Sequence, residues 1–174
     1  MENLIYTLLL IVHNIALVGC AAAPFFNLRL VNQRAQFGRK VFYQLDKVVE
    51  DTIQGLEPYC WTFIILLFAT GFGFPITYYA FHGKLKDFSS VVFTTFLLKH
   101  LFVVGMVVIA FYITFFINPK IKEIFLKFSP ETLPQEEIAN SFFGLRAKRK
   151  KLCKICFVFA LLILIVSPIL RFYS

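Results

Sequence analysis

Two histidines, His13 and His100, each interrupt a long apolar stretch of this 174-residue chain. An ionisable side chain inside a membrane-spanning segment is costly, so it is a functional-site hypothesis by default. Two imidazoles that project inward from separate helices can coordinate one metal ion or the two axial faces of a haem. We expect the two histidines to act as a pair of ligands. The alternative is that each only hydrogen-bonds a neighbouring helix.

The composition is that of an integral membrane protein. The chain is 59% hydrophobic with 23 Phe and only 16% charged residues, and its mean hydropathy is +0.74, which is too apolar for an ordinary soluble domain. A helix crosses a hydrocarbon core of about 30 Å with roughly 20 apolar residues. Four windows are long enough, near residues 4–26, 59–81, 91–117 and 152–170. We therefore predict an all-α, integral membrane four-helix bundle, with residues 1–174 as a single domain and amphipathic helices on the cytoplasmic side.

The first window is interpreted as a retained span, because no basic residue precedes it and its apolar part is too long for a signal peptide. Positive charges then orient the spans. The loop between spans two and three carries only Lys84 and Lys86, whereas the other two connections are basic. The cations of those connections are Arg29, Arg34, Arg39, Lys40, Lys47, Lys120, Lys122, Lys127, Arg146, Lys148, Arg149, Lys150 and Lys151. This pattern predicts a multi-pass protein of the bacterial cytoplasmic membrane with both termini outside.

The net charge of +8 is assigned to this topological signal and to attraction by anionic lipid. Nucleic acid is not an expected partner, because the cations lie beside spans and alternate with acidic residues. Those acidic residues are Asp46, Glu50, Asp51, Glu136 and Glu137.

Both basic connections are expected to contain helix. Phe37, Val41, Leu45, Val48 and Leu56 recur at helical spacing, which predicts a helix on the cytoplasmic face or an extension of span two, with a bend at Pro58. Span three is expected to stop at Asn118-Pro119, since helices commonly end before a proline. An amphipathic piece over 121–128, a turn at Ser129-Pro130 and a helix that begins near Pro134 and continues into span four should follow.

Small or helix-weakening residues occur in spans one and two. Gly19–Pro24 ends span one, and such residues let a neighbouring backbone or a ligand come near, so this helix should face the interior. Thr70–Pro75 contains two glycines and a proline that weaken span two, which indicates either a packing kink or a ligand contact.

The histidines are expected at one depth. His13 follows Leu4 by nine residues and His100 follows Val91 by nine, so each lies roughly 13–14 Å along its helix. Aromatic, aliphatic and small surroundings suit a haem better than a bare divalent ion, and the chain lacks the Cys-x-x-Cys-His sequence of covalent attachment. Non-covalent haem b is therefore the expected cofactor. Lys99, His82, Lys84 and Lys86 are the cations available to its propionates, although His82 also fits a solvated interfacial residue.

Sulfur offers a competing cofactor. Cys20 lies seven residues after His13 and Met106 six after His100, and soft sulfur with imidazole suits copper. Cys153 and Cys156 form a Cys-x-x-Cys pair that could bind metal or do redox chemistry, or could be two buried reduced thiols. Cys60 has no evident partner.

His13 before a run of small residues, and Leu98-Lys99-His100 in a span that ends at Asn118-Pro119-Lys120, resemble a known family over spans one to three. It comprises four-helix membrane proteins of the copper-resistance protein D and membrane protoporphyrinogen oxidase type. The resemblance implies b-haem binding, with functional roles for His13 and Lys99. The chain differs from the oxidase-like members in the residues that end span one and in the histidine that directly follows the lysine.

The leading prediction is a b-type haem protein that acts in electron transfer or porphyrin-linked redox chemistry, with His13 and His100 as axial ligands. An oxidase activity, quinone or porphyrin as substrate, a redox partner protein and homo-oligomers all stay open. One alternative is a copper carrier or permease that uses His13, Cys20, His100 and Met106. Another is a small structural subunit of a respiratory membrane complex.

Overall fold

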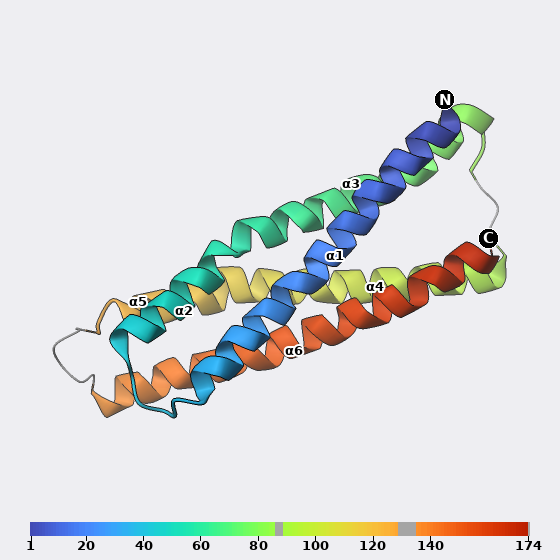
Figure 1. Ribbon diagram of the computed structural model, residues 1–174. Helices are drawn as coiled ribbons and strands as arrows, with labels where there is room; N and C mark the ends of the chain where they lie inside the picture. The colour runs from blue at the N-terminus through green and yellow to red at the C-terminus, as the bar shows by residue number, and fades with distance from the viewer. Residues whose placement is uncertain (86–88, 129–134, 174) are drawn as a thin grey trace.

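The structure is a computed structural model that describes residues 1–85, 89–128 and 135–173, with the side chains of Val91 and of residues 168–173 left out. The described residues are helical and contain no strand, so the predicted all-α class is confirmed for them. The elements in Figure 1 are α1 (Glu2–Ala35), α2 (Tyr43–Gly55), α3 (Glu57–His82), α4 (Ser90–Tyr112), the π-helical turn η1 (Ile113–Ile117), α5 (Asn118–Phe125) and α6 (Glu136–Tyr173).

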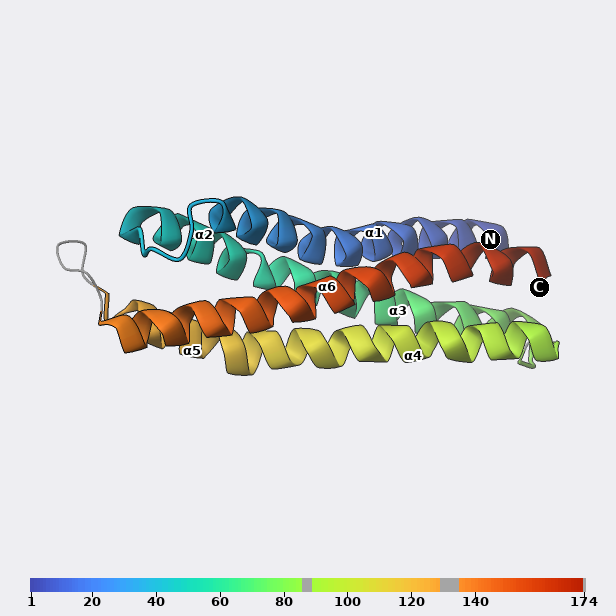
Figure 2. The ribbon, with the colours of Figure 1, turned by 90° about the horizontal axis from the view of Figure 1, so that it is seen from below.

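Four long helices run side by side along one axis (Figures 1 and 2). Helix α1 packs along α3 and α6, and α4 packs along α6. Helices α1 and α4 run in the same direction. The N terminus and the end of α6 lie at one end of the bundle, here called the terminal end. Helices α2 and α5 and the start of α6 lie at the opposite end, here called the charged end.

Three helical stretches are long and apolar enough to cross a membrane: Glu2–Ala35, Tyr43–His82 and Val92–Phe125. They contain the first three predicted spans, which supports a membrane location by length and composition. The fourth predicted span, 152–170, lies within α6, which does not meet the same criteria over its described residues. That span stays a prediction.

The sequence predicted that the third span stops at Asn118-Pro119, and that prediction is wrong. The chain passes through η1 and continues as α5 to Phe125. Proline is tolerated here because it occupies the first turn of α5, where a backbone N–H has no helical partner in any case. The predicted turn at Ser129-Pro130 lies outside the described residues. The helix expected from Pro134 onward is described from Glu136.

Helix α2 extends span two, with a break at Leu56, and the face that it buries is not the predicted one. Val48 belongs to the predicted apolar face but is 63% exposed. The buried residues are Asp46, Val49, Glu50 and Ile53. The apolar periodicity failed here because the structure buries two carboxylates of this helix, and their partners come from other helices.

One apolar core, of Ile117, Ile121, Phe128 and Phe142, lies at the charged end. Another occupies the middle of the bundle and joins all four long helices. Its buried members are Ala16, Leu17, Cys20, Ile64, Leu67, Val103 and Ile163. Glycine lets α1 and α3 approach closely beside this core. A Cβ at Gly19 would lie 2.5 Å from the ring of Phe63, and one at Gly73 would lie 2.8 Å from Leu9. The small residues of both helices therefore serve close packing, and α3 continues past Pro75 as one helix.

Gly19→Ala should destabilise the bundle by about 1–3 kcal/mol, because the new methyl group overlaps the Phe63 ring and overpacking has this cost. Gly144→Ala in α6 is the matched control, since a Cβ there meets nothing within 4 Å. It should stabilise by about 0.5–1 kcal/mol through helix propensity. Thermal unfolding in detergent, followed by helical circular dichroism, measures both. Equal effects of the two substitutions would contradict the close approach.

Candidate functional site

The hydrogen bonds of His13 fix which ring nitrogen carries its proton. His13 Nδ1 lies 2.8 Å from Thr70 Oγ1, and the Thr70 hydroxyl donates its own hydrogen to the Leu66 carbonyl at 2.7 Å. The hydroxyl oxygen is then the acceptor and His13 Nδ1–H the donor. Phe74 packs edge-on against the imidazole, with ring centroids 5.6 Å apart. The lone pair of His13 Nε2 is therefore available to a ligand.

His100 has the same tautomer as His13, and a single hydrogen bond is enough to assign it. Its Nδ1 lies 2.7 Å from the Phe96 carbonyl of its own helix, and a carbonyl can only accept. Nδ1–H is thus the donor and Nε2 carries the lone pair. Histidines that bind metals commonly donate their other ring N–H in this way, which fixes the ring orientation and raises its basicity.

The two histidines lie at equivalent positions in two helices that run the same way. His13 precedes the buried Ala16 of α1 by three residues, and His100 precedes the buried Val103 of α4 by three. Ala16 and Val103 belong to the same core. Both histidines therefore lie about one helical turn from the core, on the side of the terminal end. His13 is half-buried and His100 is exposed, and His13 is near enough to His100 and Lys99 to interact with them electrostatically.

The other predicted site residues are placed around this pair. Lys99 is half-buried beside His100 and makes no hydrogen bond or ion pair with another described residue. His82 ends α3, where its Nε2 lies 3.3 Å from a Glu2 carboxylate oxygen and its ring packs on Tyr78. Lys84 is exposed just after α3, and Lys86 lies outside the described residues.

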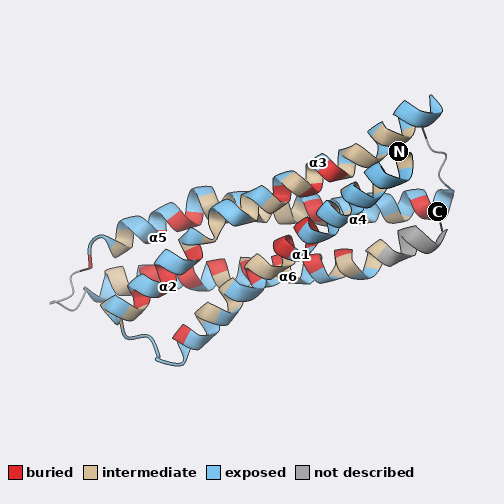
Figure 3. Cartoon of the chain, turned by 45° about the horizontal axis from the view of Figure 1, so that its top comes forward, coloured by how far each residue is buried: buried red, intermediate tan, exposed pale blue. Residues whose placement is uncertain are grey.

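The terminal end has little core of its own. Among the described side chains beyond the two histidines toward that end, Val92 alone is buried. Figure 3 shows the same distribution, with buried residues gathered in the middle and at the charged end. Apolar side chains at the terminal end, such as Leu8 and Phe93, are about half exposed. The pair of histidines therefore lies at the edge of the packed part of the bundle.

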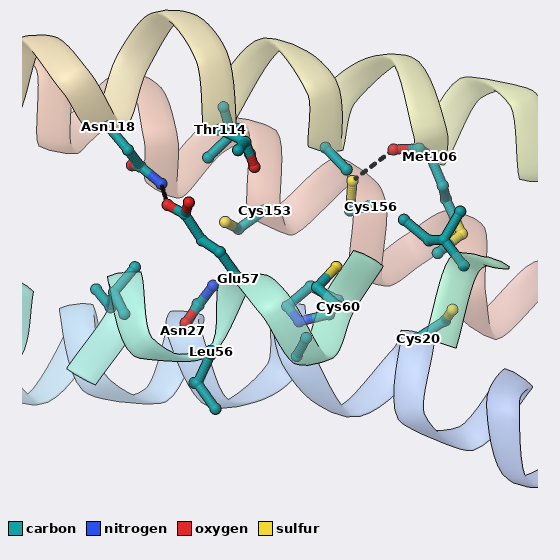
Figure 4. Close-up of a pocket in the computed structure, with 16 residues that line it drawn as sticks. Cys20, Asn27, Leu56, Glu57, Cys60, Met106, Thr114, Asn118, Cys153 and Cys156 are labelled. Atoms are coloured by element: carbon teal, nitrogen blue, oxygen red, sulfur yellow. Dashed lines mark hydrogen bonds between the residues drawn. The ribbon is translucent and has the colours of Figure 1, made fainter. Parts of the chain in front are cut away.

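The sulfur atoms lie elsewhere. Cys20, Cys60, Met106, Cys153 and Cys156 all line one cavity of about 70 Å³ between the four long helices (Figure 4), and neither histidine lines it. The copper ligand set predicted from sequence is thus divided between two places. Among the described residues, no group of three His, Cys, Asp or Glu side chains is arranged to hold a metal ion.

The charged end contains a buried ion network that the sequence analysis missed. Asp46 of α2 receives two hydrogen bonds from Arg34 of α1, at 2.6 and 2.8 Å, and one from Arg146 of α6 at 2.5 Å. Glu50 binds Arg146 at 2.6 Å and receives two bonds of 2.8 Å from Arg149. All five side chains are at least 94% buried. The sequence had assigned the cations to the topological signal and to attraction by anionic lipid, and it did not predict the burial of these five side chains.

The network continues to the wall of the cavity. Arg149 donates to the Asn118 side-chain oxygen at 3.0 Å, and the Asn118 amide donates in turn to the carboxylate of Glu57. Glu57 and Asn118 both line the cavity (Figure 4). A sequence signal for the network existed: Asp46 and Glu50 are four residues apart and Arg146 and Arg149 three, so each pair shares one helix face.

The electrostatics of Asp46 follow from its partners. Helix α2 precedes the apolar span predicted over 59–81, so Asp46 lies outside it. Burial alone would raise the pKa of the Asp46 carboxyl, but hydrogen bonds from Arg34 and the charge of Arg146 outweigh burial. They hold its pKa below the ordinary value of 3.8. Asp46 is therefore ionised at neutral pH.

Comparisons with protein-family models, with curated proteins and with solved structures found no match to this chain. The resemblance to the copper-resistance protein D type therefore stays a prediction.

Asp46→Asn should lower the free energy of unfolding by about 3–5 kcal/mol, because Arg34 and Arg146 would each lose their buried counter-charge. Asp51→Asn is the matched control, since Asp51 is exposed on the same helix and its loss should cost less than about 0.5 kcal/mol. Unfolding in detergent by heat or denaturant compares the two variants. A loss at position 46 no larger than at position 51 would exclude a stabilising network.

The stabilisation by Asp46 should depend on pH in a defined direction. Because its folded-state pKa is lowered, the carboxylate stabilises the fold above its ordinary pKa of 3.8, and this contribution is lost as the pH falls through the lower folded-state value. The stability difference between wild type and Asp46→Asn should thus be constant from neutral pH to about pH 5 and shrink below pH 3.8. A difference that already disappears between pH 7 and 5 would contradict the assignment.

Proposed function

We propose that this chain is a multi-pass integral membrane protein that binds one b-type haem between α1 and α4, with His13 and His100 as the axial ligands. The observation that carries the proposal is the shared tautomer of the two imidazoles. Each ring donates Nδ1–H to a fixed acceptor, so each leaves Nε2 free as a ligand.

Lys99 supports haem over a bare metal ion. Its ammonium is half-buried next to His100 and has no anionic partner among the described residues. A cation in an apolar span is costly unless it meets an anion or extends to the interface. The propionates of a haem are carboxylates, and they would supply that anion.

The sparse core at the terminal end supports a large ligand. Helices α1 and α3 diverge from α4 and α6 toward that end (Figure 1), and nearly all its described side chains are exposed or half-buried. A macrocycle would add apolar contacts to residues such as Leu8 and Phe93, which have few now.

Bound haem would supply one-electron chemistry, with a reduction potential set by its axial ligands and its burial. The residues of the chain have separate tasks. Thr70 and the Phe96 carbonyl hold the Nδ1 protons and orient the rings, and Phe74 limits rotation of His13. Lys99 would fix the propionates. We propose electron transfer or porphyrin-linked redox chemistry as the activity, with quinone, porphyrin or a redox protein as partner, and with the charged end facing the cytoplasm.

Purified protein should show a Soret band, and an α band that sharpens on reduction. His13→Ala and His100→Ala should each abolish or convert this spectrum, because each removes one axial ligand. His82→Ala is the matched control: His82 pairs with Glu2 at the bundle end, and its loss should leave the bands unchanged. Absorption spectra of the oxidised and reduced protein, with iron determined per chain, measure these effects.

The proposal fails if the protein carries no haem after expression with excess haem precursor and addition of haem in vitro. It also fails if the spectrum survives both histidine substitutions. Helical circular dichroism of each variant confirms that a lost spectrum reflects a lost ligand rather than a lost fold.

A further inference from the structure

The sulfur atoms of this chain converge on one place. The chain has four Cys and two Met, and all of these residues except Met1 line the cavity inside the bundle. The lining sulfur residues come from every long helix: Cys20 from α1, Cys60 from α3, Met106 from α4, and Cys153 and Cys156 from α6. All four cysteines are free thiols. Figure 4 shows them around a common space, together with Glu57 and Asn118.

Cys60 is the central member of this group. The thiols of Cys20, Cys153 and Cys156 are each near enough to Cys60 to interact with it electrostatically. Cys153 and Cys156 lie three residues apart on one face of α6, and both are more than 90% buried. Helices α3 and α6 therefore present thiols to the cavity from different sides.

We propose that this cavity binds one soft d10 metal ion, of the class to which Ag(I) and Cu(I) belong, between the thiolate of Cys60 and a thiolate of α6 from Cys153 or Cys156. Thiolate and thioether sulfur select soft ions. Met106 adds a neutral sulfur donor to the same wall. This site involves neither histidine, so it is independent of the proposed haem.

The number of ligands decides which ion suits the cavity. A structural zinc site needs four ligands in a tetrahedron, and no three His, Cys, Asp or Glu side chains of the described chain are arranged for one. Soft monovalent d10 ions accept two thiolates in a line, which rotation of single cysteine side chains can provide. The volume of about 70 Å³ holds one ion and a few waters, whereas sites for organic ligands measure about 300–1,000 Å³.

Residues near the proposed metal site can balance its protons and charges. Each thiol that binds the ion loses its proton, and no electron is transferred. Two protons are therefore released: the Glu57 carboxylate on the cavity wall, bonded through Asn118 to the network at the charged end, accepts one, and the other passes to the solvent. Two thiolates and one monovalent ion carry a net negative charge, and the guanidinium of Arg149 is near enough to Cys153 to offset it.

The test is a titration of purified protein with Ag(I) in the presence of a competing soluble thiol. Ag(I) is the probe because, unlike Cu(I), it is not oxidised to a divalent ion by air or by ferric haem. Wild type should bind one Ag(I) per chain, measured by elemental analysis after dialysis. The bound ion should protect Cys60 and one α6 cysteine from alkylation by a small maleimide, as read by peptide mass spectrometry. Cys60→Ser and the double variant Cys153→Ser/Cys156→Ser should each lower the apparent affinity at least tenfold.

Cys20→Ser is the matched control, a substitution of the same type in the same cavity, and it should retain the site. Helical circular dichroism and the melting temperature check that each variant is folded. His13→Ala and His100→Ala should keep the Ag(I) stoichiometry, so failure of the metal site and failure of the haem proposal are distinguishable. The inference is overturned if wild type binds no Ag(I), if Cys60→Ser binds it as tightly as wild type, or if Cys20→Ser loses it as fully as Cys60→Ser.

Discussion

The buried ion network at the charged end joins three helices, α1, α2 and α6, beside the apolar cluster around Ile121 and Phe142. Arg34 comes from α1, Asp46 and Glu50 from α2, and Arg146 and Arg149 from α6. Taking a charge out of water costs several kcal/mol, and a well-placed opposite charge with additional hydrogen bonds offsets that cost. An alignment of these helices that left one guanidinium unpaired would be strongly disfavoured. The network therefore acts as a constraint on how the helices align, beyond any net stability that it adds.

This constraint and the two apolar cores leave only the terminal end of the bundle thinly packed. Asn118 and Glu57 extend the network to α5 and α3, so every α-helix except α4 contributes a residue to it. Helix α4 is connected to the network through η1 and α5, which continue it in the chain. A bundle that is held at one end and packed in the middle can leave its other end thinly packed. That end carries the histidines and Lys99.

The sequence predicted the architecture well where apolar length decides the outcome. The all-α class and the positions of three helices long and apolar enough to cross a membrane follow from long apolar stretches of the sequence. It failed where a polar residue is buried by a distant partner. Val48 looked like a core position and is exposed, while Asp46 looked like a surface charge and is fully buried, because Arg34 and Arg146 are supplied by other helices. Local periodicity contains no information about such partners.

The candidate site, too, could be predicted from sequence only in part. Both histidines were found from sequence because an ionisable residue stands out in an apolar span, whereas their tautomers depend on Thr70 and on a backbone carbonyl, which only the fold places beside them. The sequence also contains no indication that the cysteines line one cavity, because Cys60 has no partner within its own helix.

The nitrogen and sulfur donors of this bundle differ in how firmly they are held, and that difference matches the ligands proposed for them. The two imidazoles are fixed by hydrogen bonds in one orientation and one tautomer. The thiols line a cavity without converging on a point, and their contacts are weaker, such as the 3.9 Å hydrogen bond from Cys156 Sγ to the Met106 carbonyl. Ala16 and Val103, both buried in the apolar core, separate His13 from Cys20 on α1 and His100 from Met106 on α4. A rigid macrocycle requires ligands set in advance on its two faces, whereas a small soft ion can gather adjustable thiolates around itself. A single copper site that used the imidazoles together with the sulfur atoms would require these side chains to move through that layer of the core. The tight packing of protein interiors opposes such a movement.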